Sequence, residues 1–361
     1  MRLRALTTQN FRNLAAAEQA FHPHVNVLVG RNGQGKTNLL EAIYFLATTK
    51  SFRTPRTASV FRFESPNVFV SGALERGGVE RTLSVGLETG ETKRRVLMIN
   101  GEKVTLSAYL RAMSVFAYSS ARLEILRGAP EEKRRFLDRG LASVSPSYLD
   151  ELTRYTRVLK QRNALLQSIA AGQASPSTLD AWDVELVAAG GAIHRARSAY
   201  AEAAALAYRE IVAQHGYHVR DLNIGYRPSL LDDIGRLRRH EIRARVSLAG
   251  PQRDTIEFTV DGRPAAEVLS GGEQKMVVLF LKFAKLELFR RKFDEPAMFL
   301  LDDVDAELDL EILQELLVRL PAETQVFATS AKERFLSVLE AGPHRRLLLE
   351  NGRVTAANDF G

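Results

Sequence analysis

The sequence of 361 residues contains no cysteine, so disulfide bonds, thiolate metal sites and cysteine nucleophiles are excluded. It also lacks an uninterrupted run of about 18 apolar residues, the length that a membrane-spanning helix needs. Its first residues, Met-Arg-Leu-Arg-Ala-Leu, run directly into a strand-like pattern without the apolar segment of a secretion signal. These absences predict a cytoplasmic protein with no membrane partner.

What the chain does contain is the composition of a globular protein, with 45% hydrophobic and 26% charged residues. At about 150 residues per domain, its length predicts two or three structural units. Lysine and arginine outnumber the acids 50 to 43, which gives a net charge of +7. This basic surplus favours a polyanionic partner such as nucleic acid, but charge alone leaves the question open because many basic proteins bind no DNA.

Residues 30–37 are the most informative stretch. They read Gly-Arg-Asn-Gly-Gln-Gly-Lys-Thr, the G-x-x-x-x-G-K-T pattern of a phosphate-binding loop, or P-loop. A short apolar strand is expected before it at 25–29 and a helix after it at 38–46, which is the context that the motif requires. A glycine-rich turn that binds nothing is the alternative, and the complete motif between correct flanks argues against it.

Each residue type in this loop suits the binding of a phosphate or of Mg²⁺. Glycines let backbone N–H groups turn inward, and together with the helix N-terminus these groups favour an anion. Lys36 is expected to reach the β- and γ-phosphates of ATP and to take part in catalysis, and the hydroxyl of Thr37 is expected to ligate Mg²⁺. The predicted nucleotide contacts in this loop are Gly30, Arg31, Asn32, Gly33, Gln34, Gly35, Lys36 and Thr37.

The pattern along the chain predicts an α/β protein with a helical insertion. Three strand-like runs at 68–74, 81–87 and 94–99, separated by turn residues, predict an antiparallel β meander. Further strands are expected at 3–8, 25–29, 219–226, 254–260, 297–301, 325–329 and 346–350, and further helices at 130–138, 230–244, 270–291 and 308–320. The predicted domains are a discontinuous nucleotide-binding lobe of 1–112 and 246–361, and a helical arm lobe of 113–245.

Two long helices dominate the predicted arm lobe. The helix at 147–170 has apolar residues spaced alternately three and four apart, with the polar Arg162 as the exception. After a break at 172–177, a second helix carries a heptad stripe in which Trp182 is interpreted as a packed anchor rather than a base-stacking platform. Together they predict a hairpin over 147–215, in the form of a short antiparallel coiled coil.

A second motif, Ala-Met-Phe-Leu-Leu-Asp-Asp at 297–303, is an apolar strand that ends in two acids. A buried parallel strand delivers such carboxylates at its C-terminal end, beside the P-loop. We assign Asp302 to Mg²⁺ and Asp303 to the attacking water as a general base. A strand that ends in a solvated acidic turn is the alternative, and the P-loop in the same chain argues against it.

A third motif, Leu-Ser-Gly-Gly-Glu-Gln at 269–274, opens a helix and forms a second candidate anion site at Ser270, Gly271 and Gly272. An ordinary serine N-cap, with two glycines that ease the turn, is the alternative. Because one chain then holds two phosphate sites of different design, the simplest arrangement is a homodimer. In it, each Ser270 closes on the ATP that the other chain's P-loop holds.

These motifs, with Asp-Ala-Glu-Leu-Asp at 305–309 as a D-loop, resemble an ABC-type ATPase. The long separation of Lys36 from Asp302, with a helical hairpin between them, is similar to the SMC-like heads of DNA maintenance proteins. Within that group the chain resembles the RecF family. The resemblance rests on Asn-Phe-Arg-Asn at 10–13, Gly-Gln-Gly-Lys-Thr-Asn-Leu-Leu-Glu-Ala-Ile-Tyr at 33–44, Ser-Phe-Arg at 51–53, residues 128–138 and 158–166, and Gly-Pro-Gln-Arg-Asp at 250–254.

The resemblance implies an ABC-type P-loop ATPase head with an antiparallel β subdomain and an inserted helical lobe. It also implies an ATP-dependent dimer that binds double-stranded DNA and ss/ds junctions. Such a protein works with RecO and RecR to load RecA, in the repair of gapped DNA, in replication and in the SOS response. It is a weak DNA-dependent ATPase whose main role is that of a switch.

The chain departs from the family pattern at several positions. Ser-Ala-Arg-Leu at 120–123 stands where the family often has Pro-Glu-Asp-Leu, so no Q-loop glutamine is assigned. Gln252 replaces a usual histidine, and Thr329 and Ser330 stand where ABC proteins have their switch histidine. Asp303 replaces the usual glutamate base, and this shorter side chain predicts slow hydrolysis.

Basic clusters at 93–95, 133–135, 236–245 and 290–292 are candidates for DNA contact. Acidic neighbours make 133–135 more typical of a solvated mixed-charge helix, whereas few acids accompany 236–245. No motif suggests that the protein reads base sequence, so we expect these clusters to contact the DNA backbone and to recognise its shape. His215 and His218 have no third ligand in the pattern and are not assigned to a metal.

Two rival functions remain. One is the ATPase subunit of a membrane transporter, which the helical arm, the basic charge and the RecF-like stretches oppose. The other is an ATP-binding scaffold without DNA whose P-loop is a relic, which the intact Lys36, Thr37, Asp302 and Ser270 oppose.

Overall fold

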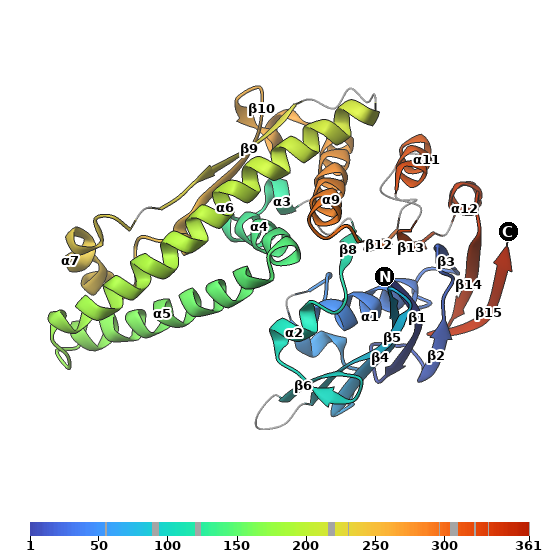
Figure 1. Ribbon diagram of the computed structural model, residues 1–361, viewed down its shortest axis with the longest axis horizontal. Coiled ribbons are helices and arrows are strands. Elements are labelled where there is room, and N and C mark those ends of the chain that lie inside the picture. The colour runs from blue at the N-terminus through green and yellow to red at the C-terminus, as the bar shows by residue number, and fades with distance from the viewer. Residues whose placement is uncertain are drawn as a thin grey trace. The chain divides into compact units, whose positions relative to one another are not determined.

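The computed structural model describes residues 1–54, 56–88, 94–119, 124–215, 221–229, 231–295, 297–303, 310–320, 323–330 and 332–360 (Figure 1). They form two compact units, which are Met1–Arg122 with Phe289–Gly361, and Leu123–Leu288. The lobes expected at 1–112 with 246–361 and at 113–245 stay a prediction. Residues 246–288, which the prediction assigned to the first lobe, pack with the second compact unit.

The first unit contains a sheet in the order β15-β14-β3-β13-β12-β8. Its strands are β3 (Val25–Val29), β8 (Val115–Tyr118), β12 (Met298–Leu301), β13 (Gln325–Thr329), β14 (His344–Glu350) and β15 (Arg353–Phe360). All neighbours pair in parallel except β14 and β15, which form an antiparallel hairpin. Strands β12 and β13 are buried at every residue, as is typical of parallel strands covered on both faces.

A second sheet of this unit is antiparallel, in the order β2-β1-β4-β5-β6-β7. Its strands are β1 (Arg2–Gln9), β2 (Ala17–Ala20), β4 (Asn67–Arg76), β5 (Val79–Glu88), β6 (Arg94–Ile99) and β7 (Glu102–Lys103). The predicted meander is thus confirmed, as part of a larger sheet. The turn predicted at Thr89 and Gly90 lies outside the described residues.

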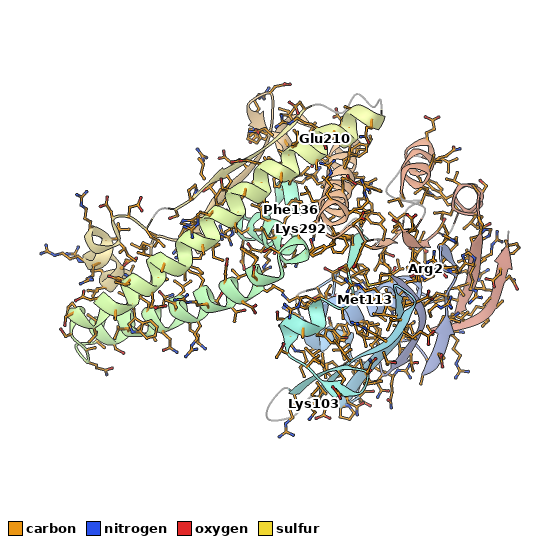
Figure 2. All side chains as sticks on the ribbon, viewed as in Figure 1. Arg2, Lys103, Met113, Phe136, Glu210 and Lys292 are labelled. Atoms are coloured by element: carbon orange, nitrogen blue, oxygen red, sulfur yellow. The ribbon has the colours of Figure 1, made fainter. Side chains whose placement is uncertain are left out.

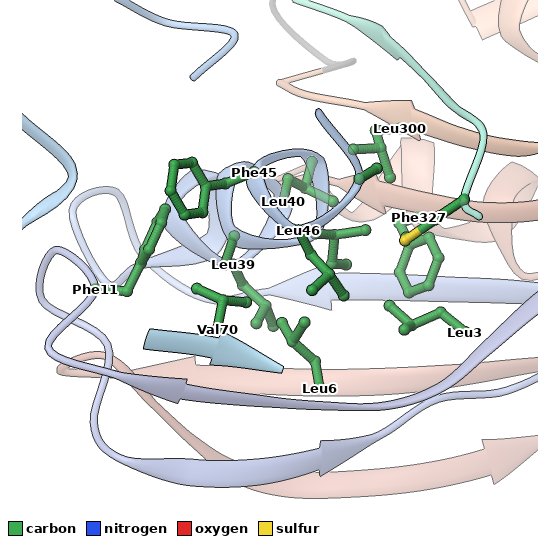
Figure 3. Packing of buried hydrophobic residues seen from close by; sticks show 14 of the residues in the cluster. Leu3, Leu6, Phe11, Leu39, Leu40, Phe45, Leu46, Val70, Leu300 and Phe327 are labelled. Carbon is green, nitrogen blue, oxygen red and sulfur yellow. The ribbon is translucent and has the colours of Figure 1, made fainter. Parts of the chain in front are cut away.

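Helix α1 (Lys36–Thr48) lies in the hydrophobic core that the two sheets share. In Figure 3, Leu40 and Leu46 of this helix lie close to Leu3 of the antiparallel sheet and Phe327 of the parallel sheet. A densely packed core of this kind fixes the position of the helix and of the loop that precedes it. The remaining described helices of the unit are η1 (Thr57–Val60), α2 (Leu106–Leu110), α11 (Leu310–Arg319) and α12 (Glu333–Leu339).

The second unit is mainly helical. It contains α3 (Glu124–Arg127), α4 (Pro130–Val144), α5 (Pro146–Ala170), η3 (Pro176–Thr178), α6 (Leu179–His215), α7 (Ile234–Ala244), η4 (Pro251–Arg253), α8 (Ala265–Val268) and most of α9 (Gly271–Phe293). A small antiparallel sheet, β11-β10-β9, is formed by β9 (Leu222–Arg227), β10 (Thr255–Val260) and β11 (Arg263–Pro264). Phe136 of α4, labelled in Figure 2, packs on Phe258 of β10 with ring centroids 5.9 Å apart.

Helices α5 and α6 form the predicted hairpin (Figure 1). Leu186, Ile193 and Tyr200 of the heptad stripe are buried, and Trp182 is half-buried. Supercoiling of the two helices stays a prediction. None of the described helices combines the length and the apolar character needed to cross a bilayer.

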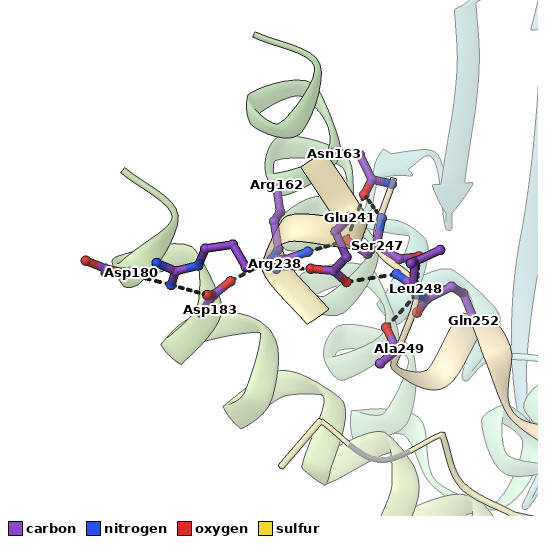
Figure 4. Close-up of polar contacts among 10 residues, drawn as sticks. All are labelled: Arg162, Asn163, Asp180, Asp183, Arg238, Glu241, Ser247, Leu248, Ala249 and Gln252. Carbon is purple, nitrogen blue, oxygen red and sulfur yellow. Dashed lines mark hydrogen bonds and ion pairs between the residues drawn. The ribbon is translucent and has the colours of Figure 1, made fainter. Parts of the chain in front are cut away.

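Arg162, the polar exception in the stripe of α5, is fully buried among acids. Its guanidinium donates to Asp183 Oδ1 at 2.7 Å, to Ser247 Oγ at 2.8 Å and to Glu241 Oε2 at 2.6 Å. Figure 4 shows this cluster, in which Arg238 of α7 also donates to Asp183. Because a buried charge is tolerated only when it is paired and hydrogen-bonded, the cluster fixes α7 against the helical hairpin.

A second buried cluster centres on Asp254, which ends the motif at 250–254. Its carboxylate accepts hydrogen bonds from Arg197 Nη1 at 2.7 Å, from the Tyr226 hydroxyl at 2.6 Å and from the Ser229 N–H at 2.9 Å. His194 Nε2 lies 3.2 Å from Oδ1. Burial raises the pKa of Asp254, but contacts with His194, Tyr226, Ser229 and Arg197 outweigh burial, so the pKa lies below its usual value of 3.8.

Replacing Asp254 by asparagine is expected to lower the free energy of unfolding at neutral pH by about 3–5 kcal/mol, because buried Arg197 loses a carboxylate partner. A carboxyl whose pKa is lowered by folding stabilises the protein above its unfolded pKa, and this contribution is lost as pH falls through the folded pKa. Urea unfolding between about pH 7 and about pH 3 should therefore show a smaller acid-induced loss of stability in Asp254→Asn than in the parent.

The control for this variant is Glu185→Gln, which removes an exposed carboxylate that pairs with Arg154 at 2.7 Å. Because exposed ion pairs contribute little, its free energy of unfolding should change by less than about 1 kcal/mol. If Asp254→Asn unfolds with the same free energy as the parent, the Asp254 cluster does not stabilise the second unit.

Candidate nucleotide-binding site

The P-loop connects β3 to α1 in the first unit. Gly30, Gly33 and Gly35 have φ angles of 137°, 82° and 109°, which side chains with a Cβ rarely adopt. A Cβ on Gly30 would lie 2.5 Å from the carbonyl oxygen of Leu349. The ammonium of Lys36 donates to two carbonyl oxygens of the loop, at 2.5 and 3.2 Å. The glycines and the lysine therefore set the conformation of the loop.

An open pocket of about 950 Å³ lies over this loop. Loop residues 31–37 line it together with residues 12, 13 and 15, residues 59 and 61–63, and residues 351 and 353. Among the described residues, the lining includes a single acid, Asp303, against Lys36 and several arginines. Because guanidinium groups bind phosphate oxygens well, this lining suits a polyphosphate. The arginines are Arg12, Arg31, Arg53, Arg62 and Arg353.

Thr37 and Asp302 are brought together although 265 positions separate them. Thr37 Oγ1 donates to Asp302 Oδ1 at 2.9 Å, and Thr329 Oγ1 donates to the same oxygen at 3.0 Å. Burial raises the pKa of Asp302, and the two hydrogen bonds oppose this effect. A hydroxyl and a carboxylate are the oxygen donors that Mg²⁺ binds in proteins.

Asp303, the predicted general base, is exposed beside Asp302 and lines the pocket. Its φ angle is 55°, a left-handed conformation that is uncommon for a residue with a side chain. Its N–H donates to Thr329 Oγ1 at 2.7 Å. Thr329 therefore contacts both acids, a role that the sequence had not indicated, since the residue was noted only as a departure from a histidine.

A buried glutamate of α1 connects two of the RecF-like stretches to the pocket. Glu41 is fully buried and accepts hydrogen bonds from Arg12 Nε and Nη2 at 2.9 and 2.8 Å, and from Ser51 Oγ at 2.5 Å. Arg53 Nη1 lies 3.6 Å from the same carboxylate and donates to Asn38 Oδ1 at 2.8 Å. Glu41 thus positions two arginines of the pocket. It lies in the RecF-like stretch 33–44, but the sequence pattern had indicated no role for it.

The turn between β14 and β15 contacts the P-loop directly. The N–H of Asn351 donates to Gln34 Oε1 at 2.6 Å, and the N–H of Gly352 donates to the Gln34 carbonyl at 2.9 Å. Gly352 has a φ angle of 77°, and a Cβ there would lie 2.0 Å from the carbonyl oxygen of Asn13. Asn-Gly between two strands is a strong hairpin signal. The sequence-based prediction did not use it and missed β15.

The predicted signature residues Ser270, Gly271 and Gly272 belong to the second unit, whereas the P-loop and the two acids belong to the first. Ser270 Oγ accepts a hydrogen bond from the Glu273 N–H at 3.3 Å, and the Ser270 N–H donates to the Glu273 carboxylate at 2.7 Å. This capping box is the arrangement that the N-cap alternative expected. All three signature residues are exposed, and a Cβ on either glycine would meet no atom within 4 Å.

The predicted D-loop at 305–309, the segment at 120–123 and His218 also lie outside the described residues. Within the described part of the chain, no three histidine, aspartate or glutamate side chains are grouped as metal ligands.

Comparison with known proteins identifies the family. The family model described as RecF/RecN/SMC N terminal domain matches residues 2–344. The DNA replication and repair protein RecF of Geotalea daltonii is 33% identical, over 98% of this chain and 100% of its own length. The chain belongs to the RecF family. RecF proteins of Anaeromyxobacter sp. and Synechococcus sp. are each 36% identical, over 95% and 91% of this chain and the same shares of their own lengths.

Solved structures share the fold of this RecF family member. A structure described as the recombination mediator protein RecF-ATP in the RecFOR pathway matches with a TM-score of 0.89 at 24% identity, over 100% of this chain and 98% of that chain. A structure described as an SMC head bound to the C-winged helix domain of ScpA matches with a TM-score of 0.56 at 14% identity. The match covers 100% of this chain and 98% of that chain. The predicted α/β head fold is thereby confirmed.

Replacing Gly352 by alanine is expected to weaken ATP binding about ten-fold or more, which corresponds to about 1.4 kcal/mol. The added Cβ would collide with the carbonyl oxygen of Asn13 and push the turn away from Gln34. Isothermal titration with ATP measures the change.

Gly262→Ala is the matched control. Gly262 also has a positive φ, of 74°, but a Cβ there meets no atom within 4 Å. It therefore shares the backbone strain without the collision, and its ATP affinity should equal that of the parent. Equal ATP affinities for Gly352→Ala and the parent would show that the β14–β15 turn does not support the P-loop.

Proposed function

We propose that the chain is an ATP-dependent DNA-binding protein that acts in the repair of gapped DNA and in DNA replication. ATP and Mg²⁺ join two copies of the chain, and the dimer binds double-stranded DNA and junctions of single and double strands. The observation that carries the proposal is the 2.9 Å contact of Thr37 with Asp302 beside an arginine-lined P-loop, since it pairs metal-binding oxygens with a phosphate site.

The residues of the pocket fit a nucleoside triphosphate with Mg²⁺. The positive φ angles of the loop glycines leave room for inward N–H groups from residues 30–37. Lys36 would exchange its carbonyl partners for the β- and γ-phosphates, and Thr37 Oγ1 and Asp302 Oδ1 would hold the metal. Bound Mg²⁺ would supply charge stabilisation to the phosphates.

The signature residues would complete this site from another copy of the chain. Ser270, Gly271 and Gly272 are exposed at the N-terminus of α9, where the helix dipole and the N–H groups of the first turn favour an anion. Each Ser270 would contact the γ-phosphate of ATP held by the other copy. A nucleotide that binds the paired state more tightly than the single chain shifts the equilibrium from monomer to dimer.

Hydrolysis would open the dimer and release DNA. Asp303 would act as general base for the attacking water, and its left-handed backbone conformation is of the kind that clusters at functional sites. Because aspartate is one methylene shorter than glutamate, hydrolysis would be slow. The chain would thus be a weak DNA-dependent ATPase whose nucleotide acts chiefly as a switch.

Family membership supports the proposed partners. The solved RecF proteins are described as recombination mediators in the RecFOR pathway. We extend this to RecO and RecR as partners of this chain and to loading of RecA as the outcome. The SOS response would be the setting, and the cytoplasm the location.

Lys36→Met is expected to abolish ATP binding and ATP-induced dimerisation, because the variant lacks the ammonium that would neutralise the phosphates. Isothermal titration reports binding, and sedimentation velocity with and without ATP reports dimerisation. A dimer of Lys36→Met that forms only with ATP would contradict the role of the P-loop.

Ser270→Arg is expected to keep ATP binding and to lose dimerisation, because a bulky side chain would occupy the N-terminus of α9. Ser177→Arg, at another exposed serine of the second unit, serves as the control and should dimerise normally. Dimerisation of Ser270→Arg with ATP, seen by sedimentation, would refute the arrangement in trans.

DNA binding measured against salt separates the proposal from its rivals. With ATP, the affinity for a gapped duplex should be high and should fall steeply as salt rises, because phosphate contacts release counterions. Without ATP it should be much weaker. No DNA binding under any condition would leave the transporter subunit and the ATP-binding scaffold as the better accounts.

A further inference from the structure

The outer face of α7 carries a row of three arginines, Arg236, Arg239 and Arg243, which we call the α7 stripe. At about 100° per residue, the three positions fall within about 60° of the helix circumference and extend over about 10 Å of its axis. They lie opposite Ile234 and Glu241, which are buried. All three are exposed, and the side chain of Arg236 is 84% exposed.

The inner face of α7 is fixed by the buried ion cluster of the second unit. Glu241 accepts hydrogen bonds from Arg162 at 2.6 Å and from the Leu248 N–H at 2.8 Å, and Arg238 donates to Asp183 at 2.7 Å. Figure 4 shows Arg238 and Glu241 turned toward these partners. Because rotation of α7 would break these buried contacts, the stripe stays directed to solvent, where Figure 2 shows side chains that end in nitrogen projecting from this helix.

The charge of the stripe is largely uncompensated. Among the described residues, Arg239 and Arg243 form no ion pair. Arg236 has one acidic contact, at 3.4 Å from Asp233, in which both side chains are mostly exposed. Exposed pairs of this kind contribute little. Glu241 is the only acid within α7, and it faces inward to Arg162.

An exposed row of arginines with few acidic partners suits a polyanion with closely spaced charges. Duplex DNA presents one negative charge per about 1.7 Å of its axis, so several phosphates face a stripe of this length. Protein interfaces centre on large apolar and aromatic side chains, and single-stranded nucleic acid is bound by stacking aromatics. The other exposed positions within α7 are Gly235, His240 and Ala244, none of which offers a large apolar surface.

We propose that the α7 stripe binds the phosphate backbone of duplex DNA as a sequence-independent contact. The inference rests on the proposed function, DNA binding, and assigns part of that binding to three residues. It also assigns a role to the buried cluster around Arg162, which fixes the helix that presents them.

The test compares the stripe variant R236Q/R239Q/R243Q with the control variant R154Q/R209Q/R227Q. Both lose three positive charges from the second unit, but each control arginine faces an acid: Glu185 at 2.7 Å, Asp221 at 3.7 Å and Glu257. Binding of a fluorescein-labelled duplex is followed by anisotropy at saturating ATP over a series of salt concentrations. Each phosphate contact contributes about 0.9 to the slope of log K against log salt, so the slope of the stripe variant should be smaller by about 3.

The control variant should keep the slope of the parent, and the loss in the stripe variant should be equal on duplexes of unrelated sequence. R236K/R239K/R243K, which retains the charges, should restore most of the slope. An unchanged slope in the stripe variant would overturn the assignment. Equal losses of slope in the stripe and control variants would also overturn it, because they would show an effect of net charge and not of a site. A parent protein that binds ATP but no duplex would instead overturn the proposed function.

Discussion

A hydrogen bond of 2.9 Å between the hydroxyl of Thr37 and the carboxylate of Asp302 joins parts of the chain that lie 265 positions apart. It requires that β3, β13 and β12 pair in parallel and that α1 begins at Lys36, within the P-loop. Burial of α1 in the core shared by the two sheets supplies that framework. The phosphate loop, Asp303, Arg12 and Arg53 line one pocket because this packing is in place.

The second unit, like the first with Glu41, combines buried charged side chains with apolar packing. Arg162 and Asp254 each lie inside the unit with several hydrogen-bond partners, and each connects a segment after α6 to the helical hairpin. Such clusters add little net stability over apolar packing, but they permit few alternative arrangements. The consequence for function is a fixed direction for α7, whose remaining arginines face solvent.

Sequence patterns predicted the elements that depend on neighbouring residues, and not those that depend on distant partners. The P-loop and the α5–α6 hairpin follow from spacing within a few turns. Glu41, by contrast, has meaning only through arginines and a serine brought from other segments, and Thr329 only through the two acids that follow the neighbouring strand β12. Strand β8 was missed because its four residues carry too short a pattern, whereas the hairpin signal at Asn351 was present and overlooked.

The central claim is that the P-loop pocket is half of a site which another copy completes. An equimolar mixture of Lys36→Met and Ser270→Arg, examined by sedimentation velocity with ATP, tests it most directly. Neither variant should dimerise alone, but a mixed pair retains one intact site, formed by the P-loop of one copy and Ser270 of the other. The account predicts a heterodimer with one ATP per two chains. A mixture that stays monomeric at saturating ATP would contradict it.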